Sequence, residues 1–302
     1  MLFHEYYKNW ILLYKENAVR GVTLSKYLSA LQWVQKIAPN LMVENLTRTN
    51  YQLLLNEYAK THEKQTTTDF HHLLKACILD AIDDGYITKD PTRRVTIKGK
   101  PPVEKKDKYL NQFELHKLLE DLNLDYKNKY EWLIYIGAKT GMRFSEILAI
   151  TPEDFDAHTQ TFSINKTYDY KNGTGFVPTK NQSSIRRVQV DWQTANKFYG
   201  FIQGKDAKQP VFITMGQKIY NATVNDILSR HCKNVNIPEI SYHGLRHTHA
   251  SVLLYAGVSV ASISKRLGHA DIATTQKVYL HIIKEMDSFD TDVIMKTMSL
   301  LG

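Results

Sequence analysis

The sequence predicts a mainly α-helical fold with a small antiparallel β-sheet in its second half, organised as two domains. The chain has 302 residues, 43% of them hydrophobic, which fits two domains with sizeable cores better than one domain or three. Apolar residues recur at helical spacing in most segments, and alternating β-formers gather between about residues 161 and 190. A basic stretch with three prolines separates the two parts.

The first domain, residues 1–90, is predicted to consist of four short amphipathic helices. Pro39 closes the second helix, Thr47 and Thr49 are candidate caps for the third, and Gly85 ends the fourth. We interpret the aromatic stripes of these helices as core packing. Apolar spacing places the helices near 3–14, 22–37, 51–58 and 68–84.

Residues 91–108 are predicted to link the domains. The segment contains seven Lys or Arg against two acidic residues, with three prolines and a glycine, a composition that keeps a chain extended and outside a core. Its charge is typical of a solvated linker, or of a strap that lies along a phosphate backbone. The basic residues considered for such contacts are Arg93, Arg94, Lys98, Lys100, Lys105 and Lys106.

The second domain, residues 109–302, begins with helices near 111–122 and 130–139 and a third that opens after Gly141. Strands are expected at 161–168, 176–179 and 185–190, with residues 180–184 as the hairpin turn between the last two. The remaining pattern predicts helices at about 192–203, 221–234, 243–256, 259–267 and 272–286, followed by an amphipathic piece at 290–299.

The composition narrows the class of protein. A formal net charge of +8 favours a polyanionic partner, either nucleic acid or an anionic membrane surface. The two cysteines, Cys77 and Cys232, lie far apart, which argues against a disulfide scaffold or a cysteine zinc site and fits a reducing compartment. No run reaches the roughly 18 apolar residues of a membrane span, and the N-terminus lacks the apolar run of a signal peptide. We therefore expect a soluble cytoplasmic protein with no membrane partner.

Two basic residues stand at turns where they can meet a phosphate. In TGMRFSEI, Gly141 permits a turn and Arg143 lies at the mouth of the next helix, where its planar guanidinium can face an anion. An exposed helical arginine is the ordinary alternative. Lys180, at the expected hairpin tip, can approach a leaving oxygen and donate a proton, although lone turn lysines are common.

The motif HGLRHTHA combines groups for anion binding and proton transfer. A helix that starts near His243 places Arg246 one turn away on the same face. A metal site formed by His243, His247 and His249 is an alternative, but no HExxH or carboxylate–histidine pattern supports it. For His247 we favour a structural role.

The last pattern, LGHADIATTQKVYLH, places His269 at a turn into a helix and Tyr279 ten residues further on. Together the four patterns resemble the tyrosine recombinases, or phage-type integrases, whose catalytic set is Arg, Lys, His-x-x-Arg, His and Tyr in that chain order. The resemblance is strong over about 107–285. Over 1–90 it is limited to the architecture, because the family carries a helical core-binding domain there. The matching residues are Arg143, Lys180, His243, Arg246, His269 and Tyr279.

The resemblance implies a DNA strand transferase that needs neither a metal ion nor another cofactor. Tyr279 attacks a phosphodiester and forms a 3′-phosphotyrosyl link, and the released 5′-hydroxyl, or that of a partner strand, reverses the step. The two arginines hold the non-bridging oxygens, and Lys180 protonates the leaving oxygen. His243 is the base toward the tyrosine, and His269 positions the phosphate.

The resemblance also implies a two-domain clamp on double-stranded DNA attachment sites, in the cytoplasm of a bacterial host. The chain is then a monomer in free solution and a homotetramer on DNA, where accessory bending or directionality proteins act with it. The apolar tail, about 285–302, is expected to dock on a neighbouring subunit, or else on its own domain. Many integrases carry a further N-terminal arm-binding domain, whereas this sequence begins close to the core-binding helices, as in a short recombinase or a trimmed one.

Integration or excision of a mobile element or prophage is therefore the expected function. A type IB topoisomerase shares the chemistry but needs no partner site. A non-catalytic DNA-binding regulator needs neither Tyr279 nor Lys180, so the complete catalytic set argues against it. A metal-dependent hydrolase is the third alternative.

Overall fold

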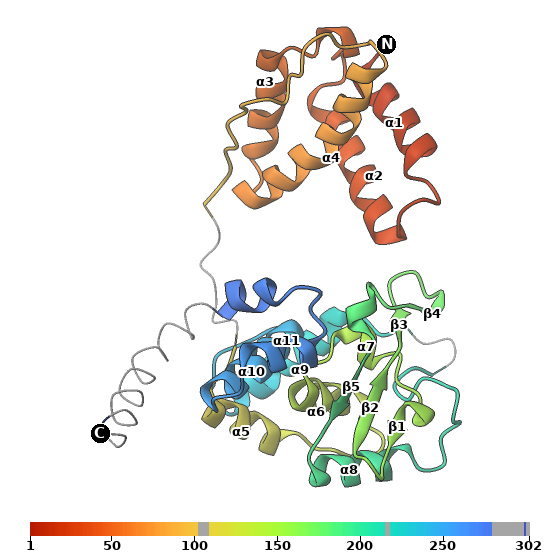
Figure 1. Cartoon of the computed structure of the whole chain (residues 1–302), viewed down its shortest axis with the longest axis vertical. Helices are drawn as coiled ribbons and strands as arrows, with labels where there is room; N and C mark the ends of the chain where they lie inside the picture. Colours follow the sequence, from red (N-terminus) through yellow and green to blue (C-terminus); the bar gives the residue numbers. More distant parts are fainter. Residues whose placement is uncertain (102–108, 215–217, 280–298, 300–302) are drawn as a thin grey trace. The chain divides into compact units, whose positions relative to one another are not determined.

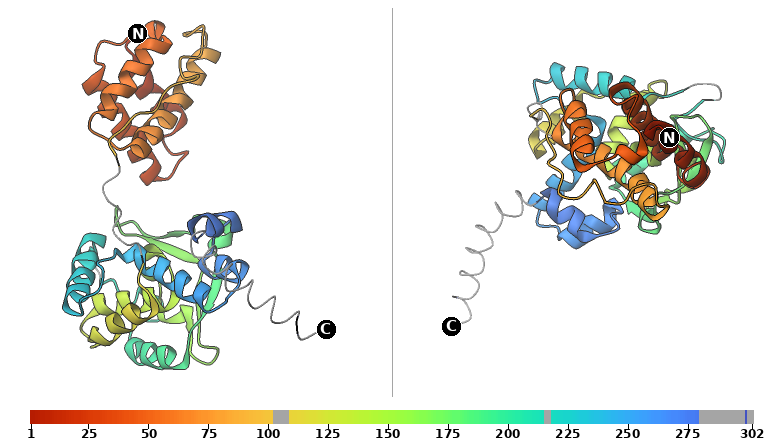
Figure 2. Two further views of the ribbon diagram at one scale, coloured as in Figure 1. Left: turned by 90° about the vertical axis from the view of Figure 1, so that its left-hand side faces the viewer. Right: turned by 90° about the horizontal axis from the view of Figure 1, so that it is seen from above.

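The computed structural model of the chain describes residues 1–101, 109–214, 218–279 and 299. It divides the protein into two compact units, Met1–Lys105 and Lys106–Gly302 (Figure 1; Figure 2). Each unit has its own hydrophobic core and is described by itself. Helices dominate both units and strands β1 to β5 belong to the second, so the predicted fold class is confirmed.

The first unit contains four helices packed around a common core. The side chain of Thr47 accepts a hydrogen bond from the backbone N–H of Asn50 at 3.2 Å and so caps the third helix, as predicted. The fourth helix begins at Lys64, earlier than expected, because its first turn carries no large apolar residue that periodicity can detect. The helices are α1 (Phe3–Tyr14), α2 (Gly21–Ile37), α3 (Arg48–Ala59) and α4 (Lys64–Asp83).

The basic segment after α4 is extended but not detached from the first unit. Val95 and Ile97 pack against its core, and the side-chain amide of Gln52 bonds both the N–H and the carbonyl of Thr96 at 2.9 Å. Farther along, Lys100 N–H donates to the carbonyl of His62 at 2.8 Å. The prediction that the whole segment stays outside a core is therefore wrong for residues 95–100, because Val95 and Ile97 turn inward while Thr96, Lys98 and Lys100 stay exposed. Residues 102–108, which include Lys105 and Lys106, lie outside the described residues.

The second unit is built around α6 (Lys129–Thr140), which is buried along almost its whole length. Its middle, residues 132–138, carries no charged side chain, and a helix segment without a polar face has to lie inside a core. The neighbouring α10 (Tyr242–Tyr255) packs against it, and the hydroxyl of Tyr242 donates to the carbonyl of Leu133 at 3.0 Å. Around this pair lie α5 (Gln112–Asp121), α7 (Phe144–Ile147), α8 (Trp192–Ile202), α9 (Asn221–Asn234) and α11 (Val260–Leu267).

Residues 272–279 continue the chain as a helix. The predicted helix at 272–286 can thus be compared only over its first part, and residues 280–286 and 290–298 lie outside the described residues. None of the helices in the described part of the chain combines the length and the apolar character that a membrane span requires.

The strands form two antiparallel sheets rather than one. Strands β1 (Phe155–Asp156), β2 (Thr161–Ile164) and β5 (Arg186–Gln189) make the first sheet, and β3 (Lys166–Asp169) and β4 (Gly175–Pro178) make the second. The single strand expected at 161–168 is therefore wrong, because its pairing partner changes at Asn165: Ile164 faces Arg186, whereas Lys166 faces Pro178.

The expected hairpin around residues 180–184 is also wrong, since β4 and β5 belong to different sheets. The chain reverses instead at residues 170–174, where the carboxylate of Asp169 accepts hydrogen bonds from the N–H of Asn172 and the hydroxyl of Thr174. Residues 182–184 form a 3₁₀ turn that is capped by Asn181. Hydrogen bonds to the Asn181 side chain thus take the place of the β-strand pairing that the alternating sequence pattern suggests.

The core of the second unit is expected to depend on Phe198, which is fully buried against Phe155 and Phe162. Phe198→Ala should lower the free energy of unfolding by about 3–5 kcal/mol, because it removes buried area and leaves a cavity. Tyr199→Ala is the matched control, since the neighbouring side chain is 48% exposed and its loss should change little. Urea unfolding of the two variants measures the difference, and equal midpoints would contradict the assigned core.

Candidate active site

Two helices of the second unit end in left-handed glycines whose carbonyls bind the arginines of the candidate site. Gly141 ends α6 with φ 65°, and its carbonyl accepts from Nη1 of Arg246 at 2.8 Å. Gly268 ends α11 with φ 69°, and its carbonyl accepts from Nη2 of Arg143 at 3.0 Å. An added Cβ would lie 2.8 Å from His249 at the first position and 2.9 Å from Arg186 at the second, so glycine is required at both.

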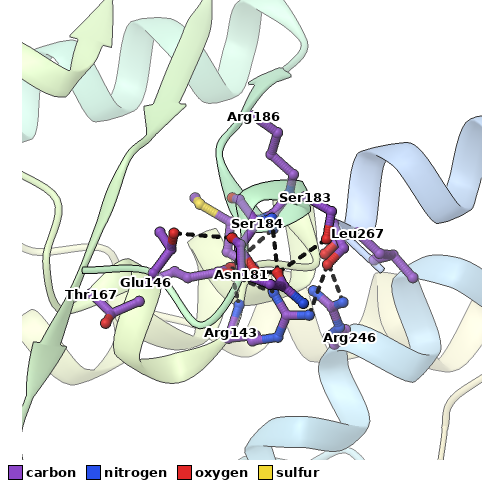
Figure 3. Close-up of polar contacts among 12 residues, drawn as sticks. Arg143, Glu146, Thr167, Asn181, Ser183, Ser184, Arg186, Arg246 and Leu267 are labelled. Atoms are coloured by element: carbon purple, nitrogen blue, oxygen red, sulfur yellow. Dashed lines mark hydrogen bonds and ion pairs between the residues drawn. The ribbon is translucent and has the colours of Figure 1, made fainter. Parts of the chain in front are cut away.

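Arg246 is 4% exposed and joins the ends of two helices. Besides the Gly141 carbonyl, it donates through Nη2 to the carbonyl of Leu267 at 2.7 Å (Figure 3). Burial, and then the charge of Arg143, lower the pKa of Arg246 to about 9, which still leaves it charged at neutral pH. These carbonyls occupy two of the five guanidinium N–H groups, so donors remain for an anion.

Glu146 connects Arg143 to a third arginine, Arg186. Its buried carboxylate accepts from Arg143 Nη1 at 2.6 Å and from Arg186 Nη2 at 2.9 Å, and it also accepts from the Arg143 backbone N–H (Figure 3). Burial alone raises the pKa of Glu146, but the hydrogen bond and charge of Arg186 and the charge of Arg143 hold it below its ordinary value. The carboxylate therefore stays ionised and fixes both guanidinium groups.

Glu146 and Arg186 are site residues beyond the six expected from the sequence. The signal for Glu146 was its position three residues after Arg143, which suits a capping interaction with the N–H of the helix-opening residue. Arg186 had no comparable local signal, because it belongs to the sheet and meets Glu146 only in the folded unit, 40 residues away in the chain.

Lys180 stands apart from these contacts. Its side chain is exposed in the loop before the 3₁₀ turn, and within the described residues no hydrogen bond or ion pair joins it to the other candidates. The loop itself is tied to the site, because Asn181 Oδ1 accepts from the hydroxyl of Ser184 at 2.6 Å and that hydroxyl lies 3.5 Å from Nη1 of Arg143. Lys180 is thus positioned by its backbone rather than by its side chain.

Tyr279 is buried, at 2% exposure, in a small cluster with Leu254, Ile263 and Leu267. Its hydroxyl lies 3.1 Å from Nδ1 of His247. Burial raises the pKa of Tyr279 to about 12, against a smaller opposing effect of the Arg246 charge. The tyrosine is therefore protonated at neutral pH and has to transfer its proton before it can act as a nucleophile.

His243 and His247 lie one turn apart on α10, with their rings edge to face at 4.9 Å. His243 is exposed, yet partial desolvation and the charges of Arg246 and Arg143 lower its pKa. Within the described residues the imidazole bonded to the Tyr279 hydroxyl is that of His247, for which the sequence had favoured only a structural role. His247 is thus a site residue that sequence reasoning missed.

His269 follows Gly268 and bonds the Thr275 hydroxyl through Nδ1 at 2.7 Å. Burial, followed by the charges of Arg246, Arg143 and Arg186, lowers the pKa of His269 to about 4. The imidazole is therefore neutral at physiological pH. Arg246 acts on the pKa values of His243, His269 and Tyr279 alike, which places these groups around one centre of positive charge.

His249, one of the three histidines of the alternative metal site, instead forms hydrogen bonds within the protein. Its Nδ1 lies 3.0 Å from the carbonyl of Ala138, and its Nε2 accepts from Nε of Arg266 at 2.9 Å. Burial and the charge of Arg266 lower the pKa of His249 to about 3. In the described part of the chain, no group of three or more His, Cys, Asp or Glu side chains is placed to hold a metal ion.

The arrangement can bind a tetrahedral anion and support an attack on it. Guanidinium donors are held at two helix ends, a protonated tyrosine is buried beside a histidine, and neutral imidazoles lie near the positive charge. Positive charge and donors fixed in advance stabilise charge that develops on a phosphoryl group. Such a site suits transesterification at a phosphodiester.

Comparisons with known proteins indicate the family to which the chain belongs. The phage integrase family model matches residues 108–286, more than half of the chain. The integrase of Staphylococcus phage L54a is 26% identical over 320 aligned residues, which cover 95% of this chain and 90% of that protein. The ICEBs1 integrase of Bacillus subtilis is 26% identical over 67% of this chain, and the match spans 57% of that protein.

Solved structures share the fold. The Tn1549 transposon integrase, in complex with a circular intermediate DNA, superposes with a TM-score of 0.77 at 19% identity, covering 92% of this chain and 94% of that one. A lambda integrase bound as a dimer to a COC′ core site gives 0.67 at 15% identity, over 92% of this chain and 77% of that one.

The chain therefore belongs to the phage integrase family. It is a tyrosine recombinase, an enzyme of the class that cleaves and rejoins DNA strands by transesterification, and the resemblance inferred from the sequence is confirmed. The match to integrases and site-specific recombinases does not favour the topoisomerase or regulator alternatives.

The neutral histidines predict a pH dependence of stability. The pKa values of His249 and His269 are about 3 and about 4, below the ordinary 6.5, so between pH 6.5 and about 4 the unfolded chain binds protons that the folded chain does not. Stability is then fully present above pH 6.5 and falls as the pH is lowered. Urea unfolding at pH 7, 6 and 5 measures the decline.

His269→Gln should flatten this pH dependence, because it removes one of the titrating groups while a polar side chain remains. His158→Gln is the control, since that histidine is exposed on the same unit and its loss should leave the slope unchanged. A slope that is equal in both variants would contradict the assignment of His269.

Proposed function

We propose that the protein is a site-specific integrase that integrates or excises a mobile element or prophage through a covalent bond between Tyr279 and DNA. Tyr279 attacks a phosphodiester and forms a 3′-phosphotyrosyl link, and a 5′-hydroxyl leaves. The observation that carries the proposal is the buried Tyr279 hydroxyl beside a histidine and close to the charge of Arg246. Because the bond energy is kept in the intermediate, rejoining needs no nucleotide cofactor.

Arg143 and Arg246 are proposed to bind the non-bridging oxygens of the phosphate. Their framework bonds to Gly268, Gly141 and Leu267 fix each guanidinium and leave further donors for the substrate. Arginine suits this role because it stays charged and donates in a planar fork. The two arginines supply the positive charge that metal ions supply in many nucleases, so the proposed chemistry requires no metal.

Lys180 is proposed to protonate the 5′-oxygen as it leaves. Its loop is held near Arg143 through Ser184, while its long side chain stays exposed and can follow the DNA. His269 is proposed to hydrogen-bond a phosphate oxygen as a neutral imidazole. The assignment of His243 as the base toward Tyr279 stays a prediction from the family pattern, and its place near Arg246 and Arg143 equally suits a contact to the phosphate.

Double-stranded DNA attachment sites are the proposed substrate, enclosed by the two units as a clamp. Support comes from the extended segment on the first unit, where Arg93, Arg94, Lys98 and Lys100 are exposed while the apolar residues between them face the core. Lys98 and Thr96 also line a surface pocket with Arg48 on α3. Exposed cations along an extended segment suit contacts to the regular negative charge of a DNA backbone.

We further propose a monomer in free solution that assembles as a homotetramer on two DNA sites, with accessory bending or directionality proteins. Closed cyclic assembly requires each subunit to offer one surface and accept another. The tail at about 285–302, of which the structure describes residue 299 alone, is the proposed connecting segment because its sequence is rich in apolar residues. The bacterial cytoplasm is the proposed place of action.

Covalent trapping tests the central assignment. A suicide DNA substrate with a nick near the cleavage point should yield a protein–DNA adduct, and Tyr279→Phe should abolish the adduct while DNA binding in a gel-shift assay persists. The phenyl ring preserves the packing around Leu267 and removes only the nucleophilic oxygen. An undiminished adduct in the variant would sink the assignment.

The exposed cations Arg93, Arg94, Lys98 and Lys100 predict that the affinity for DNA depends on salt concentration. Removal of one phosphate contact by Lys98→Ala should weaken binding across DNA sequences and reduce the slope of log K against log salt by about 0.9. Lys98→Arg keeps the charge and should keep the slope. Fluorescence anisotropy with duplex DNA over a range of NaCl concentrations measures both, and an unchanged slope in the alanine variant would remove Lys98 from the DNA contacts.

A further inference from the structure

Among the described residues, the basic side chain within hydrogen-bond distance of the candidate nucleophile is the ring of His247. Its Nδ1 lies 3.1 Å from the Tyr279 hydroxyl, within hydrogen-bond distance, and the two rings meet at 60° with centroids 5.9 Å apart. In the tautomer that carries its ring proton on Nε2, the Nδ1 of His247 can accept a hydrogen bond from the Tyr279 hydroxyl. This is the geometry that direct proton transfer requires.

His243 occupies a different position on the same helix face. It lies one turn closer to the start of α10, and its ring meets His247 edge to face at 4.9 Å. The charges that lower its pKa belong to Arg246 and Arg143, the residues proposed to hold the phosphate. The face of α10 therefore offers His243 toward the arginines and His247 toward the tyrosine.

The chemistry of Tyr279 requires an acceptor at this point. Burial raises the pKa of Tyr279 to about 12, so the hydroxyl is protonated at neutral pH, and the Arg246 charge offsets only part of the effect of burial. A phenol with a raised pKa is a poor nucleophile until a neighbouring base removes its proton. The candidate base has to touch the hydroxyl oxygen, which His247 does.

We propose that His247 is a catalytic residue that accepts the proton of Tyr279 through Nδ1 as the tyrosine attacks DNA. The Oη–H bond breaks and the proton moves to Nδ1, while the Oη–P bond forms and the P–O5′ bond breaks. The leaving 5′-oxygen takes its proton from a separate donor, for which Lys180 is proposed. During rejoining the imidazolium returns its proton to the departing tyrosine oxygen. The inference rests on the proposed role of Tyr279 and makes His243 a phosphate-binding group.

The variant His247→Asn distinguishes a role of His247 as a general base from a purely structural role. The Asn side chain keeps a hydrogen-bonding atom near the position of Nδ1 but cannot accept a proton at neutral pH. Single-turnover adduct formation on the suicide substrate should fall on the order of 10²–10⁴-fold, the usual contribution of a general base. A rate equal to that of the unchanged protein would overturn the proposal, because a purely structural bond is preserved in this variant.

A second DNA substrate distinguishes the role of His247 as the base from that of Lys180 as the proton donor to the leaving group. When sulfur replaces the bridging 5′-oxygen at the cleavage point, the thiolate leaves without a proton. The defect of Lys180→Ala should then disappear, whereas the defect of His247→Asn should persist. Recovery of His247→Asn on the sulfur substrate would overturn the proposal by making His247 the donor instead.

His247→Ala gives a third readout, since added imidazole should restore adduct formation in a concentration-dependent manner, and lack of rescue in a variant that still binds DNA would count against the proposal. Tyr279→Phe keeps the two proposals distinguishable. If its adduct is lost while His247→Asn is unimpaired, only the role of His247 fails. If Tyr279→Phe still forms the adduct, the proposed function itself fails.

Discussion

The second unit depends on the buried guanidinium of Arg246. A buried charge costs several kcal/mol unless it is paired, and here the partners are the carbonyls of Gly141 and Leu267 at the ends of α6 and α11. Helix C-termini carry partial negative charge, so these carbonyls are well suited to hold a cation. The same bonds fix three helices relative to one another and leave donors for an anion. Arg246 therefore both holds the helices together and provides donors for an anion.

Around Arg246 the protein gathers more positive than negative charge. Three guanidinium groups surround the single carboxylate of Glu146, which pairs with Arg143 and Arg186 and is kept ionised by them. Burial, and then this excess of positive charge, lower the pKa values of His243 and His269 and keep both histidines neutral. A site that is positive and equipped with neutral imidazoles attracts a phosphodiester and still offers groups that can accept or donate a proton.

The proposed nucleophile, Tyr279, is held in place by burial and is not ionised in advance. Tyr279 lies in a small apolar cluster that lies against α10 and α11, and burial keeps the phenol protonated until the reaction. Its hydroxyl is held by His247 on the helix that also carries Arg246. One helix thus carries both Arg246, which is proposed to bind the phosphate, and His247, which contacts the proposed nucleophile, so their positions are coupled. The two glycine caps complete this coupling, because each turns a carbonyl toward an arginine.

The sequence by itself determined the family, the fold class, most helix positions and the six candidate residues, because hydrophobic periodicity and short motifs are local properties of the chain. It did not determine how the strands pair: residues 176–179 and 185–190 both read as β-structure, but their partners are chosen by the register along residues 161–169. Nor did it reveal Arg186 beside Glu146 or His247 beside Tyr279, since those contacts join residues 40 and 32 positions apart. Only the folded unit decides which groups share a site, because burial and charge act through space.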